Sequence, residues 1–257
     1  FPYLDKRFKQ DKEIALLAID FEWEMLREID ESLLNDRDII LLALEKNART
    51  LNFASESLKN DEAIVLASMS GYESESVIFD KKWTTNPDFM RKAIKHNPAN
   101  FAFVDTSLKA DRNFVQSAIE LGAAIDEDVS DELKQDRELV LASVKNNGSS
   151  LEHADVSFME DKDIVLEAIQ QTGEALEHAD ESLRKDRELV LIAAKNGGKG
   201  LAYTDKTLQA DRELMLAAVN QYSGALSYAD QSLKSDRAIV LAALANDSLK
   251  SYEVTSL

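Results

Sequence analysis

Apolar and polar positions recur along the chain with a fixed period of 25 residues. Within each period, apolar residues follow one another at spacings of three and four, the pattern of one face of an α-helix, rather than in the alternation typical of a strand. Residues 186–210 are representative, because Leu189, Val190, Ala193 and Ala194 share one helical face. We therefore expect an α-helix in every period and no β-sheet.

An acidic residue marks the start of almost every period, and we call these positions the anchors. They are Asp11, Asp36, Asp61, Asn86, Asp111, Asp136, Asp161, Asp186, Asp211 and Asp236. An Asp or Asn side chain can accept hydrogen bonds from the free backbone N–H groups in the first turn of a helix. We expect a helix to begin within about two residues of each anchor.

The rest of the unit is read from residues 186–210. Asn196, Gly197 and Gly198 are expected to stop the helix, with glycine in the left-handed conformation. A second, shorter helical segment is expected around Leu201–Tyr203. The stretch from Asp205 to Ala210 is expected to form the turn into the next anchor.

Small residues recur seven positions after each anchor, where the chain always has Ala or Ser. Close packing of helices from successive units needs a small side chain at the crossing. One unit cannot bury its apolar face alone, but stacked units can. The sequence thus predicts an all-α fold: an α-solenoid of about ten helix–turn–short-helix repeats, which form a curved superhelix and a single repeat domain over residues 1–257.

The middle of the array departs from the pattern, and residues 61–135 are expected to be irregular. Leu stands five positions after the anchor in eight units, but Arg91 and Gln116 replace it in the other two. A cationic patch of Arg91, Lys92, Lys95 and His96 follows, and we expect it to be a protein-binding surface. The alternative is a local change of stacking or a bend, which the prolines at 87 and 98 would accompany.

Charge narrows the choice of partners. The chain has 48 Asp and Glu against 30 Lys and Arg, a net charge of −18. Such a surface repels nucleic acid and anionic membranes, so we expect neither as a direct ligand. A protein or peptide with a basic surface is favoured. Without cysteine there can be no thiolate zinc site or cysteine nucleophile.

Besides the anchors, a second set of regularly spaced carboxylates, which we call the second carboxylate ladder, needs its own explanation. It consists of Asp5, Asp30, Asp80, Asp105, Asp155, Asp180, Asp205 and Asp230. Helix capping explains these residues without a metal ion. His153 and His178 occupy one slot of adjacent units and could join Asp155 and Asp180 in a metal site. The same slot holds Phe53, Phe103, Tyr203 and Tyr228 elsewhere. Stacking is therefore the preferred role, and no cofactor is expected.

The recurring string L(K/R)xDRE(L/I)VLxAxxxNG resembles a tandem-repeat family known mainly from bacteria, catalogued as a domain of unknown function, number four-one-one-six. Its unit spans about two of the present repeats, and the match is best in residues 136–240 and 36–60. The resemblance implies a helical repeat. It brings no catalytic residues, cofactor or established partner.

These observations favour a non-enzymatic protein-binding scaffold with an elongated acidic surface. One alternative is an acidic mimic of nucleic acid that inhibits a DNA- or RNA-binding protein. Another is an accessory repeat region of a larger enzyme. No apolar run is long enough to cross a bilayer and no secretion signal is evident. The expected location is cytoplasmic, or inside a host cell if the parent protein is a bacterial effector. The oligomeric state stays open.

Overall fold

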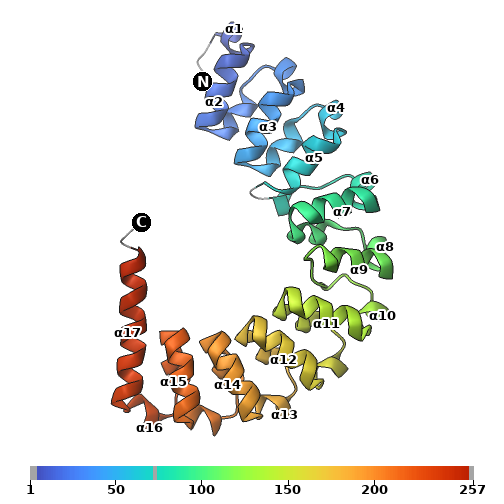
Figure 1. Cartoon of the computed structure of the whole chain (residues 1–257). Coiled ribbons are helices and arrows are strands. Elements are labelled where there is room, and N and C mark those ends of the chain that lie inside the picture. The colour runs from blue at the N-terminus through green and yellow to red at the C-terminus, as the bar shows by residue number, and fades with distance from the viewer. Residues whose placement is uncertain (1–4, 72–73, 255–257) are drawn as a thin grey trace. The chain divides into compact units, whose positions relative to one another are not determined.

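The computed structural model describes residues 5–71 and 74–254 of the chain. Throughout these residues the fold is helical and contains no β-strand, which confirms the predicted all-α class. The chain divides into two compact units, residues 1–108 and 109–257, which are described separately. In both units most 25-residue periods contribute three consecutive elements: a long α-helix, a 3₁₀-helix and a short third helix (Figure 1).

A long helix begins directly after every anchor, as predicted. The long helices are α2 (Lys12–Phe21), α3 (Arg37–Lys46), α5 (Glu62–Met69), α7 (Pro87–His96), α9 (Arg112–Glu120), α11 (Arg137–Asn146), α12 (Lys162–Gln171), α14 (Arg187–Asn196), α15 (Arg212–Gln221) and α17 (Arg237–Val254). The anchor side chain caps each of them. Oδ1 of Asp136, for example, accepts hydrogen bonds from the backbone N–H groups of Glu138 and Leu139, at 3.0 and 3.2 Å.

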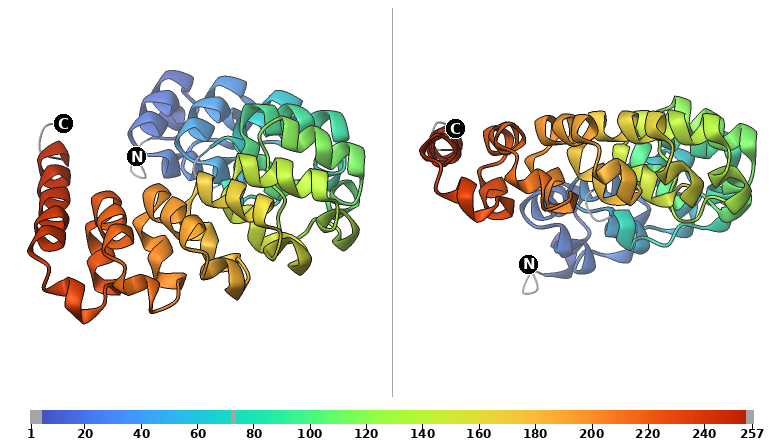
Figure 2. Two further views of the ribbon diagram at one scale, coloured as in Figure 1. Left: turned by 60° about the horizontal axis from the view of Figure 1, so that its bottom comes forward. Right: turned by 90° about the horizontal axis from the view of Figure 1, so that it is seen from below.

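The predicted second helical segment is a 3₁₀-helix in most periods. These helices are η1 (Trp23–Arg27), η3 (Ala48–Phe53), η4 (Ser74–Ser76), η5 (Pro98–Phe103), η6 (Gly148–His153), η8 (Gly173–His178), η9 (Gly198–Tyr203) and η11 (Ser223–Tyr228). In residues 109–257, η6, η8, η9 and η11 pack against one another in sequence order, and the long helices do the same (Figure 2). Each layer therefore continues from unit to unit.

The stretch before each anchor is a third short helix rather than the simple turn that we expected. These elements are α1 (Lys6–Lys9), η2 (Glu31–Asn35), α4 (Glu56–Lys59), α6 (Lys81–Thr84), α8 (Thr106–Lys109), α10 (Asp131–Lys134), η7 (Val156–Met159), α13 (Glu181–Arg184), η10 (Leu208–Ala210) and α16 (Gln231–Lys234). The second carboxylate ladder caps most of them: Oδ1 of Asp180, for example, accepts from the N–H of Ser182 at 2.8 Å. Capping is thus confirmed as the role of both Asp ladders.

The expected left-handed glycine at the end of the long helix is wrong. Gly197 has a φ of 170°, which is extended backbone. Asn47, Asn147, Thr172 and Tyr222 end their helices in the same extended conformation. The reason is local, because a 3₁₀-helix starts at the next residue and the linking residue must turn the chain into it. Gly122 is the one described glycine whose φ, 99°, lies in the left-handed range that favours glycine.

The buried core is formed by four positions of each long helix from α3 to α15, and in α14 Leu189, Val190, Ala193 and Ala194 are at most 1% exposed. The predicted close approach of successive units is confirmed in residues 109–257. A Cβ atom on Gly173 would lie only 2.1 Å from the carbonyl oxygen of Ala193 in the following unit. The neighbouring helix occupies the space in which other residues carry a side chain.

Two connections depart from the repeat, and both fall inside the region predicted to be irregular. α5 has eight residues where α3 and α7 have ten, and only the three-residue η4 follows it. After α9, residues 121–130 form turns and extended chain instead of a 3₁₀-helix. The unit between them, residues 86–110, is regular. Pro87 and Pro98 do not interrupt it, because each occupies the first turn of a helix, where the missing N–H costs little.

Candidate functional site

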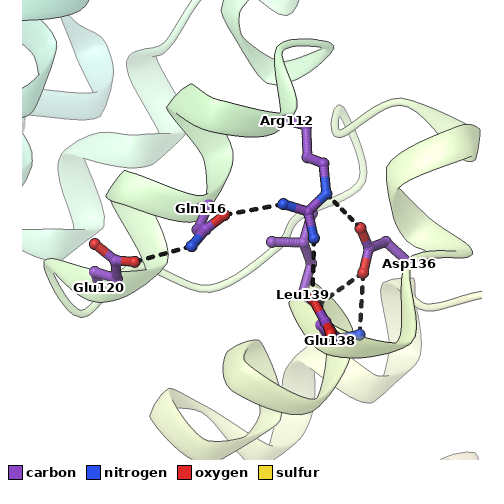
Figure 3. A network of polar contacts seen from close by, with 6 residues as sticks. All are labelled: Arg112, Gln116, Glu120, Asp136, Glu138 and Leu139. Atoms are coloured by element: carbon purple, nitrogen blue, oxygen red, sulfur yellow. Dashed lines mark hydrogen bonds and ion pairs between the residues drawn. The ribbon is translucent and has the colours of Figure 1, made fainter.

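A ladder of ion pairs connects successive units along the N-terminal ends of the long helices. Nε of Arg112 donates to Oδ2 of Asp136 at 2.7 Å, and the same guanidinium group reaches Glu138 at 3.2 Å (Figure 3). An anchor carboxylate that takes part in a rung therefore has two roles: one oxygen caps its own helix and the other binds the cation that follows the preceding anchor. Every such rung joins neighbouring units.

The ladder runs without interruption through residues 112–236. Its rungs there are Arg112–Asp136 at 2.7 Å, Arg137–Asp161 at 2.9 Å, Lys162–Asp186 at 2.7 Å, Arg187–Asp211 at 2.8 Å and Arg212–Asp236 at 2.7 Å. Residues 1–108 contain the rungs Lys12–Asp36 and Arg37–Asp61. The hydrogen bond from Arg187 lowers the pKa of Asp211, and the bond from Lys162 does the same for Asp186. Both carboxyl groups are therefore held in their charged form.

At α5 the position directly after the anchor carries an acidic residue instead of a basic one. Glu62 stands where other units have Lys or Arg, and it pairs with Lys92 of α7 at 2.6 Å. The corresponding residue of the next unit is Pro87, which has no cation to offer. This reversal explains one member of the predicted cationic patch, because Lys92 belongs to a contact between α5 and α7.

The other members of the patch lie on the same helix at different depths. Arg91 is half-buried and pairs with Asp88 of its own helix at 3.2 Å, whereas Lys95 and His96 are exposed. The slot of Arg91 is not a core position, because the Leu residues found there in other units are themselves only partly buried or exposed. A polar residue in this slot therefore requires no local change of stacking.

Gln116, the second residue that replaces Leu five positions after an anchor, is hydrogen-bonded to the cation of a rung. Its side-chain oxygen accepts a hydrogen bond from Arg112 at 2.9 Å, and its amide group donates to Glu120 at 3.1 Å (Figure 3). The replacement of Leu thus holds the guanidinium group of Arg112 in place for its two acidic partners, Asp136 before α11 and Glu138 in its first turn.

A buried lysine stabilises the irregular connection after α9. The side chain of Lys109 is fully buried, and its ammonium group donates to Asp126 at 2.6 Å and to Asp128 at 3.3 Å. A buried ammonium ion needs such partners because burial removes its hydration. Sequence reasoning missed this contact, since a lysine in this slot is common elsewhere in the array.

The exposed edge of the 3₁₀ layer in residues 109–257 carries rings and carboxylates. His153, His178, Tyr203 and Tyr228 end successive 3₁₀-helices and are all half-buried. Glu152 and Glu177 are exposed beside them, and the hydrogen bond to Glu177 raises the pKa of Tyr203. We call these six residues the ring–carboxylate row. Rings with carboxylates at their sides can hold Lys or Arg side chains.

The metal site considered for His153 and His178 gains no support. Asp155 and Asp180 cap η7 and α13 through the N–H groups of Ser157 and Ser182. Across the described part of the chain, no three His, Asp or Glu side chains are grouped so that they could hold an ion. The paired histidines therefore belong to the ring–carboxylate row.

The stacked three-element periods define this protein as an all-α repeat solenoid. The family described as "Domain of unknown function (DUF4116)" matches residues 11–59, 36–74, 86–123, 127–159, 161–209 and 211–256. The chain belongs to this family, which confirms the resemblance seen in the repeat string. No curated protein and no solved structure shows significant similarity to it. Among the described residues, no helix is both long and apolar enough to cross a membrane.

Proposed function

We propose that the chain is a non-enzymatic protein-binding scaffold, and that residues 109–257 bind a basic segment of a partner protein. The observation that carries this proposal is the combination of charge and pairing in this unit. Residues 109–257 have 28 Asp and Glu against 16 Lys and Arg. The ladder pairs four of its arginines with carboxylates of the same chain: Arg112, Arg137, Arg187 and Arg212. The excess negative charge is left for a partner.

The ring–carboxylate row is the part of this surface that best fits a basic peptide. Tyr203 and Tyr228 offer ring faces for a cation, and Glu177 stands next to Tyr203. A ring of the row recurs on η6, η8, η9 and η11, so an extended peptide can meet one ring on each of these 3₁₀-helices. Several weak contacts made together give useful affinity.

The repeated acidic pattern fits a protein partner better than mimicry of DNA. Double-stranded DNA carries one negative charge for about every 1.7 Å of its axis. In the ladder, a rung such as Arg112 with Asp136 and Glu138 carries one net negative charge. Packed helices lie about 8–10 Å apart, so the linear charge density is several-fold lower than that of DNA. Mimicry would need a denser row of carboxylates.

The proposal is tested with two fluorescent peptides of equal length, one rich in Lys and Arg and one rich in Asp and Glu. Fluorescence anisotropy on the full chain should show binding of the basic peptide alone, and added salt should weaken it. Replacement of Glu152 and Glu177 by Gln should lower the affinity several-fold. A chain with Glu13→Gln and Glu31→Gln is the matched control, since it loses the same charge from exposed positions of residues 1–108.

Two results would reject the proposal: equal binding of the two peptides, or equal loss of affinity in the Glu152/Glu177 double variant and the control. Displacement of duplex DNA from a DNA-binding protein by the chain would favour mimicry instead.

A further inference from the structure

In residues 109–257, asparagine side chains form hydrogen bonds between neighbouring long helices. The position ten residues after the anchor holds Asn146, Asn196 and Asn246 in alternate units. Nδ2 of Asn146 donates to the carbonyl oxygens of Ile119 and Ala123, both at 2.7 Å. Asn196 and Asn246 make the same type of bond to the preceding long helix, at 3.1 and 2.9 Å. The C-terminal ends of these helices are thereby tied together.

Residues 1–108 have no such asparagine in this slot, which holds Phe21, Lys46, Gly71 and His96. α5 also ends two residues earlier than its neighbours. A hollow of about 390 Å³ lies at this point. It is lined by Leu41, Leu44, Glu45, Ala67, Ser70, Gly71 and His96. Its volume is that of a small ligand pocket, and leucine and alanine side chains supply the apolar surface.

The surroundings of the hollow change in character from α2 to α7. α2 packs on α3, α3 on α5 and α5 on α7, so equivalent positions of the repeat lie on the same side of these helices. On α2 this side carries Leu17 and Phe21, which are 68% and 90% exposed, beside Asp20, which pairs with Lys46 of α3 at 2.8 Å. On α7 it carries Lys95 and His96, both exposed, and neither is in an ion pair or hydrogen bond with a described residue. From α2 to α7, the exposed apolar side chains of Leu17 and Phe21 are therefore followed by the hollow and then by Lys95 and His96.

We propose that this surface is a docking site for a protein segment that carries an apolar side chain next to an acidic one. The apolar side chain fills the hollow between α3, α5 and α7, and the carboxylate lies beside Lys95 and His96. Glu45 stands on α3, on the opposite wall from His96. It repels a carboxylate on that side, which sets the direction of the bound segment. Leu17 and Phe21 extend the apolar contact beyond Glu45.

This site is independent of the proposed binding of basic segments, because it lies in the other unit and takes the opposite charge. A peptide selected for the hollow should neither compete with a basic peptide nor respond to changes in the ring–carboxylate row. The two proposals can therefore fail separately.

The first test uses 8-anilinonaphthalene-1-sulfonate, which joins apolar rings to an anion. Fluorescence titration of the full chain should show one saturable site. Ala67→Phe fills the hollow and should weaken binding at least about tenfold, because the added ring takes the space of the bound apolar group. Lys95→Glu should weaken it a few-fold. Ala142→Phe, at the same repeat position in α11, should leave the affinity unchanged.

The second test selects peptides from a random displayed library against the full chain. Peptides that bind here should combine a large apolar residue with Asp or Glu, and should lose binding with Ala67→Phe and Lys95→Glu but not with Ala142→Phe. Lys95 is exposed, so Lys95→Glu tests the site even if Ala67→Phe disturbs folding. Selection of no such peptide, or of peptides insensitive to both changes, would overturn the proposal.

Discussion

The guanidinium group of Arg112 and the carboxylate of Asp136 join two successive units at 2.7 Å, while the other oxygen of Asp136 caps the helix that follows. Arg112 and Asp136 are 24 residues apart, and the same interval separates the partners of each rung. One carboxylate thus serves helix initiation and unit-to-unit attachment together, and the two contributions can be separated by mutation.

Asp136→Asn should retain the cap and lose the ion pair. Asn86 shows that an amide can cap, since its oxygen accepts from the N–H groups of Asp88 and Phe89. We expect a loss of about 0.2–1 kcal/mol for Asp136→Asn, because the pair is partly exposed. Asp136→Ala also removes the cap and should cost about 1 kcal/mol more. Denaturant unfolding measures both, and equal losses in the two variants would contradict a double role.

Acid should weaken the ladder. Ion pairs hold the pKa values of Asp186 and Asp211 below the ordinary 3.8. A group with a lowered folded pKa contributes stability above its unfolded pKa and loses it as the pH falls through the folded value. The thermal midpoint should therefore be insensitive to these groups above about pH 4 and fall below it. Asp211→Asn should flatten this fall, and an unchanged profile in the variant would argue against the assignment.

Gly173→Ala should destabilise the stack by about 1–3 kcal/mol, because the added Cβ atom would lie 2.1 Å from the carbonyl oxygen of Ala193. Gly197→Ala is the matched control. The nearest atom to a Cβ there is an oxygen of Glu174 at 3.0 Å, at the end of a flexible side chain, and the extended backbone suits alanine. Thermal unfolding should distinguish the two variants. Equal midpoints would show that the stack yields at Gly173.

Lys109→Ala should destabilise residues 109–257 by about 1–3 kcal/mol, since it leaves a cavity and removes the partner of Asp126 and Asp128. Lys59 occupies the same repeat position but is about one-third exposed and pairs with Glu56 on its own helix. Lys59→Ala should change stability by less than about 0.5 kcal/mol. Hydrogen exchange across residues 121–130 should accelerate in the Lys109 variant alone.

Structural features that are determined by residues close together in the sequence could be predicted. Features that depend on how separate helices follow and pack on one another could not. The anchors predicted every long helix, because an Asp that caps and the apolar positions after it act within one turn. The left-handed Gly197 was a wrong prediction, because the geometry of that residue depends on the 3₁₀-helix after it. A third helix was missed, since four residues such as Glu181–Arg184 are too few to show a period.

The candidate surfaces were only partly predictable for the same reason. The ladder had a signal, because Lys or Arg directly follows most anchors, but its partner lies 24 residues away. Lys95 and His96 were singled out by their charge. The hollow beside them depends on Gly71 and on the early end of α5, and it becomes visible only when α3 and α7 are in place. Their role in binding stays a prediction.

The interval between ladder partners also restricts how an array of this kind can change in length. Removal of residues 162–186 would join Asp161 to Arg187, leave Arg137 facing Asp161, and leave Arg187 facing Asp211. A deletion or duplication of one whole unit within residues 112–236 thus keeps every rung and every cap closed. A change that is not a multiple of 25 residues would place a cation opposite the wrong residue. As far as the rungs and caps are concerned, such an array can therefore grow or shrink by 25 residues at a time.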